Sequence, residues 1–136
     1  MKTIAYAARD AHSDLAPFEF DYRALRANDV AFEVLYCGVC HSDLHTARNE
    51  WNNTLYPSVP GHEIVGRVIE TGPDVTRHKV GDIVAVGCMV DSCQQCDQCD
   101  HGEEQYCRNG RTDSYNSPDR IDGELTRGDG GLHKRW

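Results

Sequence analysis

The sequence predicts a mostly β domain, a partly open β-barrel with short helices and a cysteine-rich lobe. Short runs of β-branched residues recur before residue 90 and are separated by turn-forming Gly, Pro and Asp. Four cysteines then crowd into fifteen residues, Cys93-x2-Cys96-x2-Cys99-x7-Cys107, with almost no large apolar side chain between them. A loop of this composition lacks a core of its own, so a bound metal ion has to replace it.

The expected strands follow one another along the chain. The first covers residues 3–7, the second residues 30–37, where side chains alternate between two faces, and the third residues 64–71. Gly66, inside the third run, indicates a β-bulge or a close backbone approach. A tight turn then leads into a further strand over residues 83–86.

A short helix is expected between the second and third of these strands. It would begin at Ser42, whose hydroxyl can cap a helix, and would place Ser42 and His45 on one face. Residues 56–61 contain two prolines and cannot continue a helix, so they form a rigid connector that leads into His62.

Length and charge restrict the class of protein. The chain fits one domain, residues 1–136, with the metal-stapled lobe at about residues 88–110 and an irregular tail at about residues 118–136. A formal charge of −8 argues against nucleic acid and anionic membrane as partners. Without a secretion signal or a membrane-spanning apolar run, the expected location is a reducing cytoplasm. The sequence has no Gly-x-Gly-x-x-Gly phosphate loop, so no Rossmann domain is expected.

The four-cysteine segment indicates a structural zinc site. Four thiolates fill the tetrahedral shell of Zn²⁺ and leave no position for water or substrate. We therefore expect Cys93, Cys96, Cys99 and Cys107 to stabilise the lobe and to take no part in catalysis. Disulfides in a secreted domain and an iron–sulfur cluster are the alternatives, and the spacing departs from both common ferredoxin patterns.

A second constellation joins Cys40, His62 and Glu63. Thiolate, imidazole and carboxylate are ligands of catalytic zinc, which keeps one position open. On the residues alone, Cys40 is equally consistent with a buried thiol and His62 with an ordinary hydrogen-bonded histidine. A redox dithiol of Cys37 and Cys40 is a further alternative, but it needs a helix that starts at Cys37, and Cys37 ends an expected strand.

Several segments together carry a resemblance to a known family. They are CGVCHSDLH at 37–45, YPSVPGHEIVG at 56–66, VGD at 80–82, GCMVDSC at 87–93 with the cysteines after it, and SYNS at 114–117. In these segments the chain resembles the zinc-dependent medium-chain alcohol dehydrogenases, in particular their cinnamyl alcohol dehydrogenase-like, NADP-preferring branch. The match runs from Ile4 to about Asp119. It implies a GroES-like β-barrel that carries two zinc sites.

The resemblance also implies roles for the metal ligands. Cys40 and His62 fall at ligands of the catalytic zinc, and Glu63 falls at a carboxylate that can approach the metal. Asp43 falls at the residue that fixes the orientation of a ligand histidine. The cysteine quartet of residues 93–107 falls at the structural zinc site.

Further implied roles concern the reaction. Ser42 and His45 would relay the alcohol proton, and His41 would lie near the phosphates of the cofactor. The implied activity is the reversible oxidation of a primary alcohol to an aldehyde, with Zn²⁺ as Lewis acid and hydride transfer to NADP. The expected substrate is a small alcohol or aldehyde.

Members of the family continue beyond the matched segments. Their chain forms a nucleotide-binding Rossmann domain and then returns to the barrel. The remaining cysteine ligand of the catalytic zinc lies outside the match. We therefore expect a truncated catalytic domain, weakly active or inactive alone, that works as a homodimer or with a separate cofactor domain. A non-catalytic zinc-binding or interaction module is the alternative, and a thiol redox protein is the third hypothesis. NADPH binding would favour the catalytic domain. Two bound zinc ions without nucleotide affinity would favour the zinc-binding module, and a Cys37–Cys40 disulfide would favour the redox protein.

Overall fold

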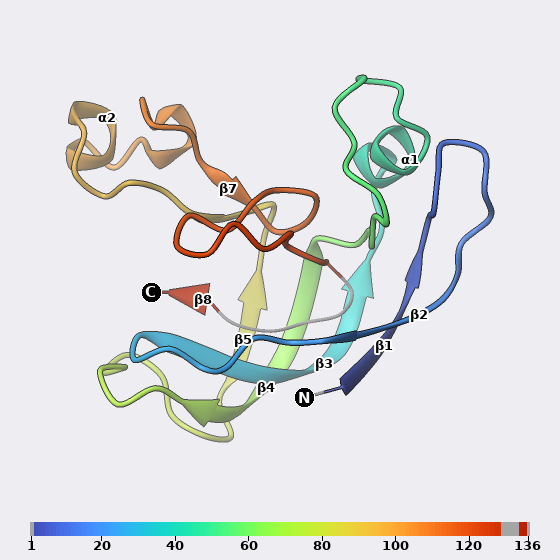
Figure 1. The fold of residues 1–136 in the computed structure, drawn as a ribbon. Helices are drawn as coiled ribbons and strands as arrows, with labels where there is room; N and C mark the ends of the chain where they lie inside the picture. The colour runs from blue at the N-terminus through green and yellow to red at the C-terminus, as the bar shows by residue number, and fades with distance from the viewer. Residues whose placement is uncertain (1, 129–133, 136) are drawn as a thin grey trace.

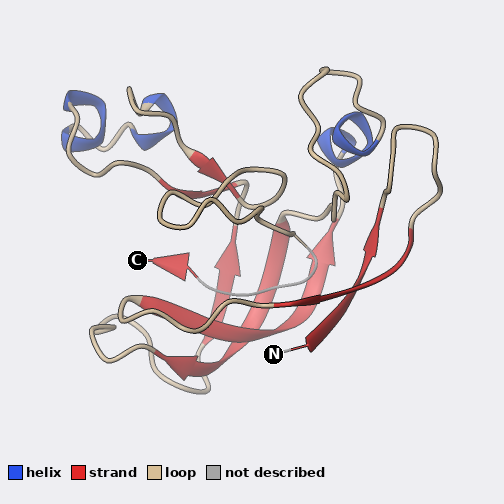
Figure 2. Cartoon of the chain, viewed as in Figure 1, coloured by secondary structure: helices blue, strands red, loops and turns tan. Residues whose placement is uncertain are grey.

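The computed structural model describes residues 2–128 and 134–135 of the chain. Its strands form three separate antiparallel sheets, and within these residues the sheets do not close into a barrel (Figures 1 and 2). The predicted fold class, mostly β with short helices and a partly open barrel, is confirmed. The longest helix of the described part has 7 residues, too short to cross a membrane.

The largest sheet has the strand order β5-β4-β3-β8. Strand β3 (Asp29–Gly38) pairs with β4 (Glu63–Thr71), and β5 (Ile83–Val86) extends the sheet beyond β4. These three strands confirm the predicted runs. On the other side, the short β8 (Lys134–Arg135) pairs with the start of β3. It lies inside the predicted irregular tail, where no periodicity indicates a strand.

Two smaller sheets complete the fold. Strands β1 (Lys2–Ala7) and β2 (Ala16–Asp21) form a hairpin, and β1 agrees with the first predicted strand. Strands β6 (Met89–Asp91) and β7 (Thr112–Asp113) pair at the base of the cysteine-rich lobe. The lobe itself contains α2 (Asp97–Asp100) and a 3-10 turn at Glu104–Tyr106. It projects away from the sheets at the upper left of Figure 1.

The core consists of two small apolar clusters. In the first, Val59 of the connector packs against the two alanines of β1 and the two phenylalanines of β2. In the second, Phe32, Ile64 and Val86 come from three neighbouring strands of the large sheet. Because Val59 is only 1% exposed, the connector that leads to His62 is anchored in the core.

Helix α1 (His41–Ala47) starts directly after β3, one residue earlier than predicted. The prediction that Ser42 caps this helix is wrong, because Cys40 is the N-cap. The Cys40 thiol accepts a hydrogen bond from the Ser42 N–H at 3.4 Å, and the Asp43 carboxylate accepts one from the Cys40 N–H at 2.8 Å. This reciprocal capping box satisfies both backbone donors and leaves the Ser42 hydroxyl free for other contacts.

The predicted tail contains an ordered part. Residues 118–128 form turns and one isolated bridge between Pro118 and Leu125, without a helix or a longer strand. The other tail residues, 129–133 and 136, lie outside the described residues.

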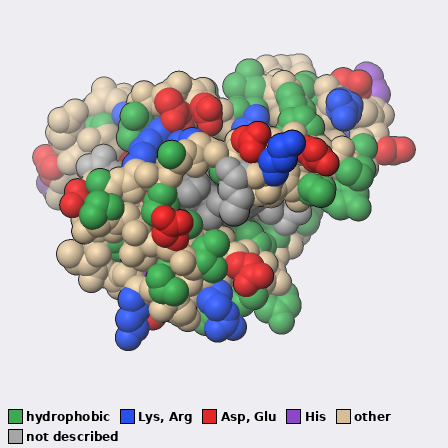
Figure 3. Space-filling view, turned by 60° about the horizontal axis from the view of Figure 1, so that its bottom comes forward, with side chains coloured by type: hydrophobic (Ala, Val, Ile, Leu, Met, Phe, Trp, Pro, Cys, Tyr) green, Lys and Arg blue, Asp and Glu red, His purple; other side chains and the backbone are tan. Residues whose placement is uncertain are grey.

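On the face shown in Figure 3, acidic and basic side chains are interspersed over the molecule. The formal charge of −8 is therefore not gathered there into one acidic patch. Nor do the described residues of this face form a broad basic surface of the kind that nucleic acid requires.

Gly66 shows both predicted features. The register between β3 and β4 shifts between Val34 and Tyr36, opposite Gly66, so the bulge lies on the partner strand. A Cβ atom on Gly66 would lie 2.2 Å from the ring of Phe32 and 2.7 Å from the Glu33 carbonyl oxygen. Only glycine fits in this close approach.

We expect Gly66→Ala to lower the free energy of unfolding by about 1–3 kcal/mol, the usual cost of overpacking a buried site. Urea unfolding of the variant measures the change. Gly87→Ala is the control, because a Cβ there would meet no atom within 4 Å. Equal unfolding midpoints for the two variants would show that the Phe32 contact does not constrain the strand.

Candidate metal centres

The first candidate centre brings together Cys40, His62 and Glu63. One ligand atom from each lies within 4.8 Å of the other two, and the Cys40 Sγ is 3.4 Å from the His62 Nε2. Cys40 is placed by the start of α1, and His62 and Glu63 by the start of β4. A thiolate, an imidazole and a carboxylate at these separations form a donor set that fits Zn²⁺.

Asp43 holds this centre together. Its carboxylate is buried and accepts hydrogen bonds from the Cys40 N–H at 2.8 Å and the Gly61 N–H at 2.7 Å. It also lies 3.1 Å from the His62 Nδ1. A carboxylate in this position keeps the proton on Nδ1 and directs Nε2 toward the Cys40 sulfur, as partners of metal-binding histidines do.

Ser42 and Tyr115 border the same centre. The Ser42 hydroxyl is 2.9 Å from the Cys40 sulfur, and the ring of Tyr115 stacks on His62 with centroids 5.3 Å apart. Burial raises the pKa of the Tyr115 hydroxyl, which lies 3.2 Å from the Thr46 hydroxyl. Tyr115 belongs to the SYNS segment at 114–117, but nothing in the sequence of that segment indicates a contact with His62.

A cavity of about 230 Å³ opens beside these residues. Ser42 and His62 line it together with Trp51, Cys88 and Tyr115. An open pocket that reaches both a candidate ligand and an adjacent hydroxyl is suited to a small organic molecule with aromatic or apolar character.

His45 lies outside the immediate centre. Its Nδ1 pairs with the Glu50 carboxylate, and its ring stands between those of His41 and Trp51, at centroid distances of 4.7 and 5.1 Å. Ser42 contacts the Cys40 sulfur instead, and no hydrogen bond within the described chain joins Ser42 to His45. The two residues of the predicted relay thus lie on the same helix, α1, and each has a different hydrogen-bond partner.

The second candidate centre is the cysteine quartet. Sulfur atoms of Cys93, Cys96, Cys99 and Cys107 all lie within 4.8 Å of one another, although more than half of the segment is irregular. Cys40, Cys88 and the four cysteines of the quartet are free thiols in the structure. Four converging sulfurs match the donor set of a structural zinc site.

Hydrogen-bond donors surround the quartet. The Arg108 N–H donates to the Cys96 sulfur at 3.5 Å, and the Ser92 hydroxyl is 3.3 Å from the Cys99 sulfur. The Asn109 side chain, followed by the Gln95 backbone, lowers the pKa of Cys93 to about 6. Metal binding requires the thiolate, so these contacts favour the state that a zinc ion needs.

The chain matches a defined family over most of its length. Residues 26–134 match the alcohol dehydrogenase GroES-like domain. The chain belongs to this alcohol dehydrogenase family. This membership confirms the resemblance of the cysteine and histidine motifs.

Curated relatives agree with the assignment. A probable cinnamyl alcohol dehydrogenase 3 from Oryza sativa subsp. japonica is 50% identical over 127 residues, 93% of this chain and 34% of the relative. The aldehyde reductase YahK from Escherichia coli (strain K12) is 52% identical over 118 residues, 87% of this chain and 34% of the relative. The chain thus spans about a third of the length of these relatives.

Solved structures share the fold. A cinnamyl alcohol dehydrogenase from Sorghum bicolor superposes with a TM-score of 0.92 at 43% identity and covers 98% of this chain, which corresponds to 38% of that structure. A cinnamyl alcohol dehydrogenase from Helicobacter pylori, complexed with NADP(H), has a TM-score of 0.92 at 36% identity, with the same coverage of 98% and 38%.

We expect Cys99→Ser to lose one zinc ion and to melt at a lower temperature, because structural sites of this type contribute on the order of 10 kcal/mol to folding. Native mass spectrometry and thermal melting report the two effects. Cys88→Ser, which changes an exposed cysteine outside both centres, is the matched control. Full metal content with unchanged melting in Cys99→Ser would contradict the site.

We expect Asp43→Asn to weaken metal binding at Cys40 and His62 by about 10–100-fold, the usual effect of losing the partner of a ligand histidine. The asparagine amide would place a donor where the native carboxylate accepts hydrogen bonds. Zinc release to a chelator should then become faster in one phase only, with Asp14→Asn, at an exposed carboxylate, as control. Equal resistance of both metals to the chelator would be evidence against the centre.

Proposed function

We propose that this chain is the catalytic domain of a zinc- and NADP-dependent alcohol dehydrogenase that interconverts small primary alcohols and aldehydes. The observation that carries the proposal is the convergence of Cys40, His62 and Glu63 around one point beside an open cavity. A closed four-ligand site could not admit a substrate, whereas this set leaves room for one.

Relatives support the reaction class and the cofactor. Their names include cinnamyl alcohol dehydrogenase, 8-hydroxygeraniol dehydrogenase and aldehyde reductase, and the Helicobacter pylori structure contains NADP(H). These names describe oxidation of an alcohol or reduction of an aldehyde. The aromatic side chains of Trp51 and Tyr115 in the cavity suit substrates with an apolar or aromatic body.

In the proposed mechanism, Cys40 and His62 would hold the catalytic ion, and the Glu63 carboxylate would be available as a further ligand. Bound Zn²⁺ supplies Lewis-acid stabilisation of negative charge on the substrate oxygen. Asp43 keeps the His62 ring oriented through the Nδ1 contact of 3.1 Å. Bound NADP would supply the hydride acceptor, and His41 would help to bind its phosphates.

The proton path uses α1. The Ser42 hydroxyl takes the alcohol proton at Oγ, and His45 receives it with the Glu50 carboxylate at its Nδ1. Because no hydrogen bond joins Ser42 to His45 within the described residues, the path would pass through a water or a ligand hydroxyl between them. The cysteine quartet holds a second, structural zinc ion and takes no part in this chemistry.

Other features concern the setting of the reaction. The free thiols of Cys40, Cys88 and the quartet fit a reducing compartment, so we place the protein in the cytoplasm. We further propose that cofactor binding needs a nucleotide-binding domain joined to this one, and that the chain alone is weakly active or inactive. Alignment of the nicotinamide with the substrate accounts for roughly 7–11 kcal/mol of a barrier.

A chimera tests the function directly. Joining this chain to the C-terminal part of aldehyde reductase YahK should give NADPH-dependent reduction of an aromatic aldehyde, with the chain alone near background. In the chimera, Ser42→Ala and His45→Ala should each lower kcat by about 100-fold, the lower end of general acid–base effects. His12→Ala, at a histidine between β1 and β2 that lies outside both centres, should match the parent.

A folded, zinc-loaded chimera without activity would contradict the proposal and favour the non-catalytic zinc-binding module. Unchanged kcat in both relay variants would instead remove Ser42 and His45 from the mechanism.

A further inference from the structure

Residues 114–128, which we call the strap, lie against the connector of residues 56–61 that leads into His62 and against Leu55, the residue before it. The strap is the orange to red loop that comes after β7 in Figure 1. It closes on itself through the Asn116 N–H, which donates to the Thr126 carbonyl at 2.9 Å. Its end meets the connector where the Gly128 N–H donates to the Val59 carbonyl at 3.2 Å.

Asn116 makes the densest contact between the two segments. Its Oδ1 accepts the Leu55 N–H at 3.0 Å, and its Nδ2 donates to the Leu55 carbonyl at 2.7 Å and to the Ser58 hydroxyl at 3.0 Å. One side chain thus satisfies both backbone groups of Leu55 and reaches a buried serine as well. Such a pairing fixes the connector in position and in direction.

The connector is short and held on its other side, so a fixed Ser58 also restrains Gly61 and His62. The backbone of Ser58 exchanges two hydrogen bonds of 2.9 Å with Ala8. Three residues further on, the Gly61 N–H donates to Asp43 at 2.7 Å, and His62 comes next in the chain. Displacement of Ser58 would therefore shift the backbone of Gly61 and the imidazole that depends on it.

We propose that Asn116 is a positioning residue for the first metal centre, because it holds the connector that presents His62. The proposal rests on the proposed function of Cys40 and His62 as ligands of the catalytic ion. It deepens that function by extending the support of the centre beyond Asp43 to a side chain on a distant loop.

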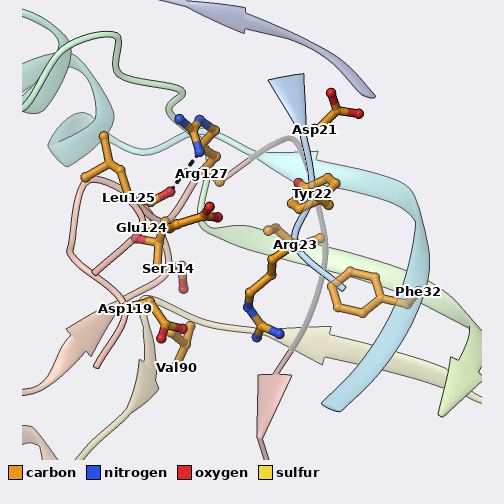
Figure 4. Close-up of a pocket in the computed structure, with 13 residues that line it drawn as sticks. Asp21, Tyr22, Arg23, Phe32, Val90, Ser114, Asp119, Glu124, Leu125 and Arg127 are labelled. Atoms are coloured by element: carbon orange, nitrogen blue, oxygen red, sulfur yellow. Dashed lines mark hydrogen bonds between the residues drawn. The ribbon is translucent and has the colours of Figure 1, made fainter. Parts of the chain in front are cut away.

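The strap is itself anchored to the rest of the domain. Asn116 can restrain the connector only if the strap that carries it is fixed. The Arg26 guanidinium pairs with Asp119 at 3.1 Å and also with Asp122. Near the C-terminal end of the strap, the Arg127 guanidinium lies 4.9 Å from the centre of the Phe20 ring. It also donates a hydrogen bond to the Leu125 carbonyl (Figure 4). Asp119 and Arg127 both line a cavity of about 70 Å³, and their contacts hold the strap at its middle and near its C-terminal end.

The end of the strap also packs closely against the backbone beside His62. A Cβ atom on Gly128 would lie 1.7 Å from the Gly61 carbonyl oxygen. The two backbones therefore touch directly beside His62, and the strap limits the movement of the connector at both Ser58 and Gly61.

Asparagine suits position 116 for two reasons. Its φ of 54° is left-handed, a conformation that asparagine tolerates better than most residues. Its amide also offers an acceptor and donors at once, whereas aspartate keeps only the acceptor. These properties allow variants that separate the side chain from the backbone conformation.

Asn116→Gly keeps the left-handed backbone and removes all three side-chain hydrogen bonds. With 4-(2-pyridylazo)resorcinol as chelator, zinc should leave the Cys40–His62 centre about tenfold faster, the lower end of effects seen for outer residues of metal sites. Release from the cysteine quartet should not change. Asn116→Asp, which keeps the acceptor for the Leu55 N–H, should show an intermediate rate.

Two further variants control this measurement. Asn52→Gly changes an exposed asparagine with a similar φ of 58° and should behave as the wild type. Ser58→Ala removes a single contact of Asn116 and should give a smaller acceleration than Asn116→Gly. Wild-type release rates in Asn116→Gly, or equal acceleration at both zinc sites, would overturn the proposal, since the latter indicates a general loss of structure.

Amide hydrogen exchange separates this proposal from the proposed function. If the wild type bound zinc only at the quartet, the catalytic metal assignment would fail, but the Gly61 N–H would still report on the connector. Faster exchange at Gly61 in Asn116→Gly than in Asn52→Gly would then support the positioning role. Equal exchange would overturn it.

Discussion

The arrangement of the first metal centre depends on one buried carboxylate. Asp43 is 2% exposed, and its oxygens contact the Cys40 N–H, the Gly61 N–H and the His62 ring. An ionised carboxylate removed from water costs several kcal/mol unless donors replace its hydration. The three donors are therefore held to it, and they come from the helix cap, the connector and the candidate ligand itself. The need to replace water around this carboxylate thus holds the start of α1 against Gly61 and His62, just beyond the point where the pairing of β3 and β4 ends at Gly38 and Glu63.

Helix α1 divides its polar side chains between two environments. Ser42 faces the Cys40 sulfur and the cavity, whereas His45 stands between two rings and pairs with Glu50. Residues three apart share a helical face, but their side chains need not touch. The gap between hydroxyl and imidazole is the space in which a bridging hydroxyl group would complete a proton path. A bound ligand or water would therefore complete the connection between Ser42 and His45.

Features carried by local sequence could be predicted. Alternation predicted β3, and the cysteine spacing predicted the quartet, because each depends on residues close together in the chain. Gly66 predicted a close backbone approach by its missing side chain alone, although its contact partner, Phe32, lies on another strand. Strand β2 is hidden by Pro17, which pairs at the end of a hairpin where its missing N–H is tolerated. Cys40 as helix cap, Tyr115 on His62 and the strap could not be predicted, since a thiol is an uncommon cap and the other contacts join residues far apart in the chain.

The strap follows the cysteine quartet in the sequence, and this order has a consequence for synthesis. Proteins are made from the N-terminus at about 5–20 residues per second, and segments fold as they become available. Cys93 and Cys107 are separated by 14 residues, so the quartet has all its sulfurs as soon as residue 107 is made. Asn116 and Ser58 are separated by 58 residues, and Gly128 is made later still. All four sulfurs of the quartet are therefore made before Asn116 and Gly128, the two residues of the strap that restrain the connector to His62.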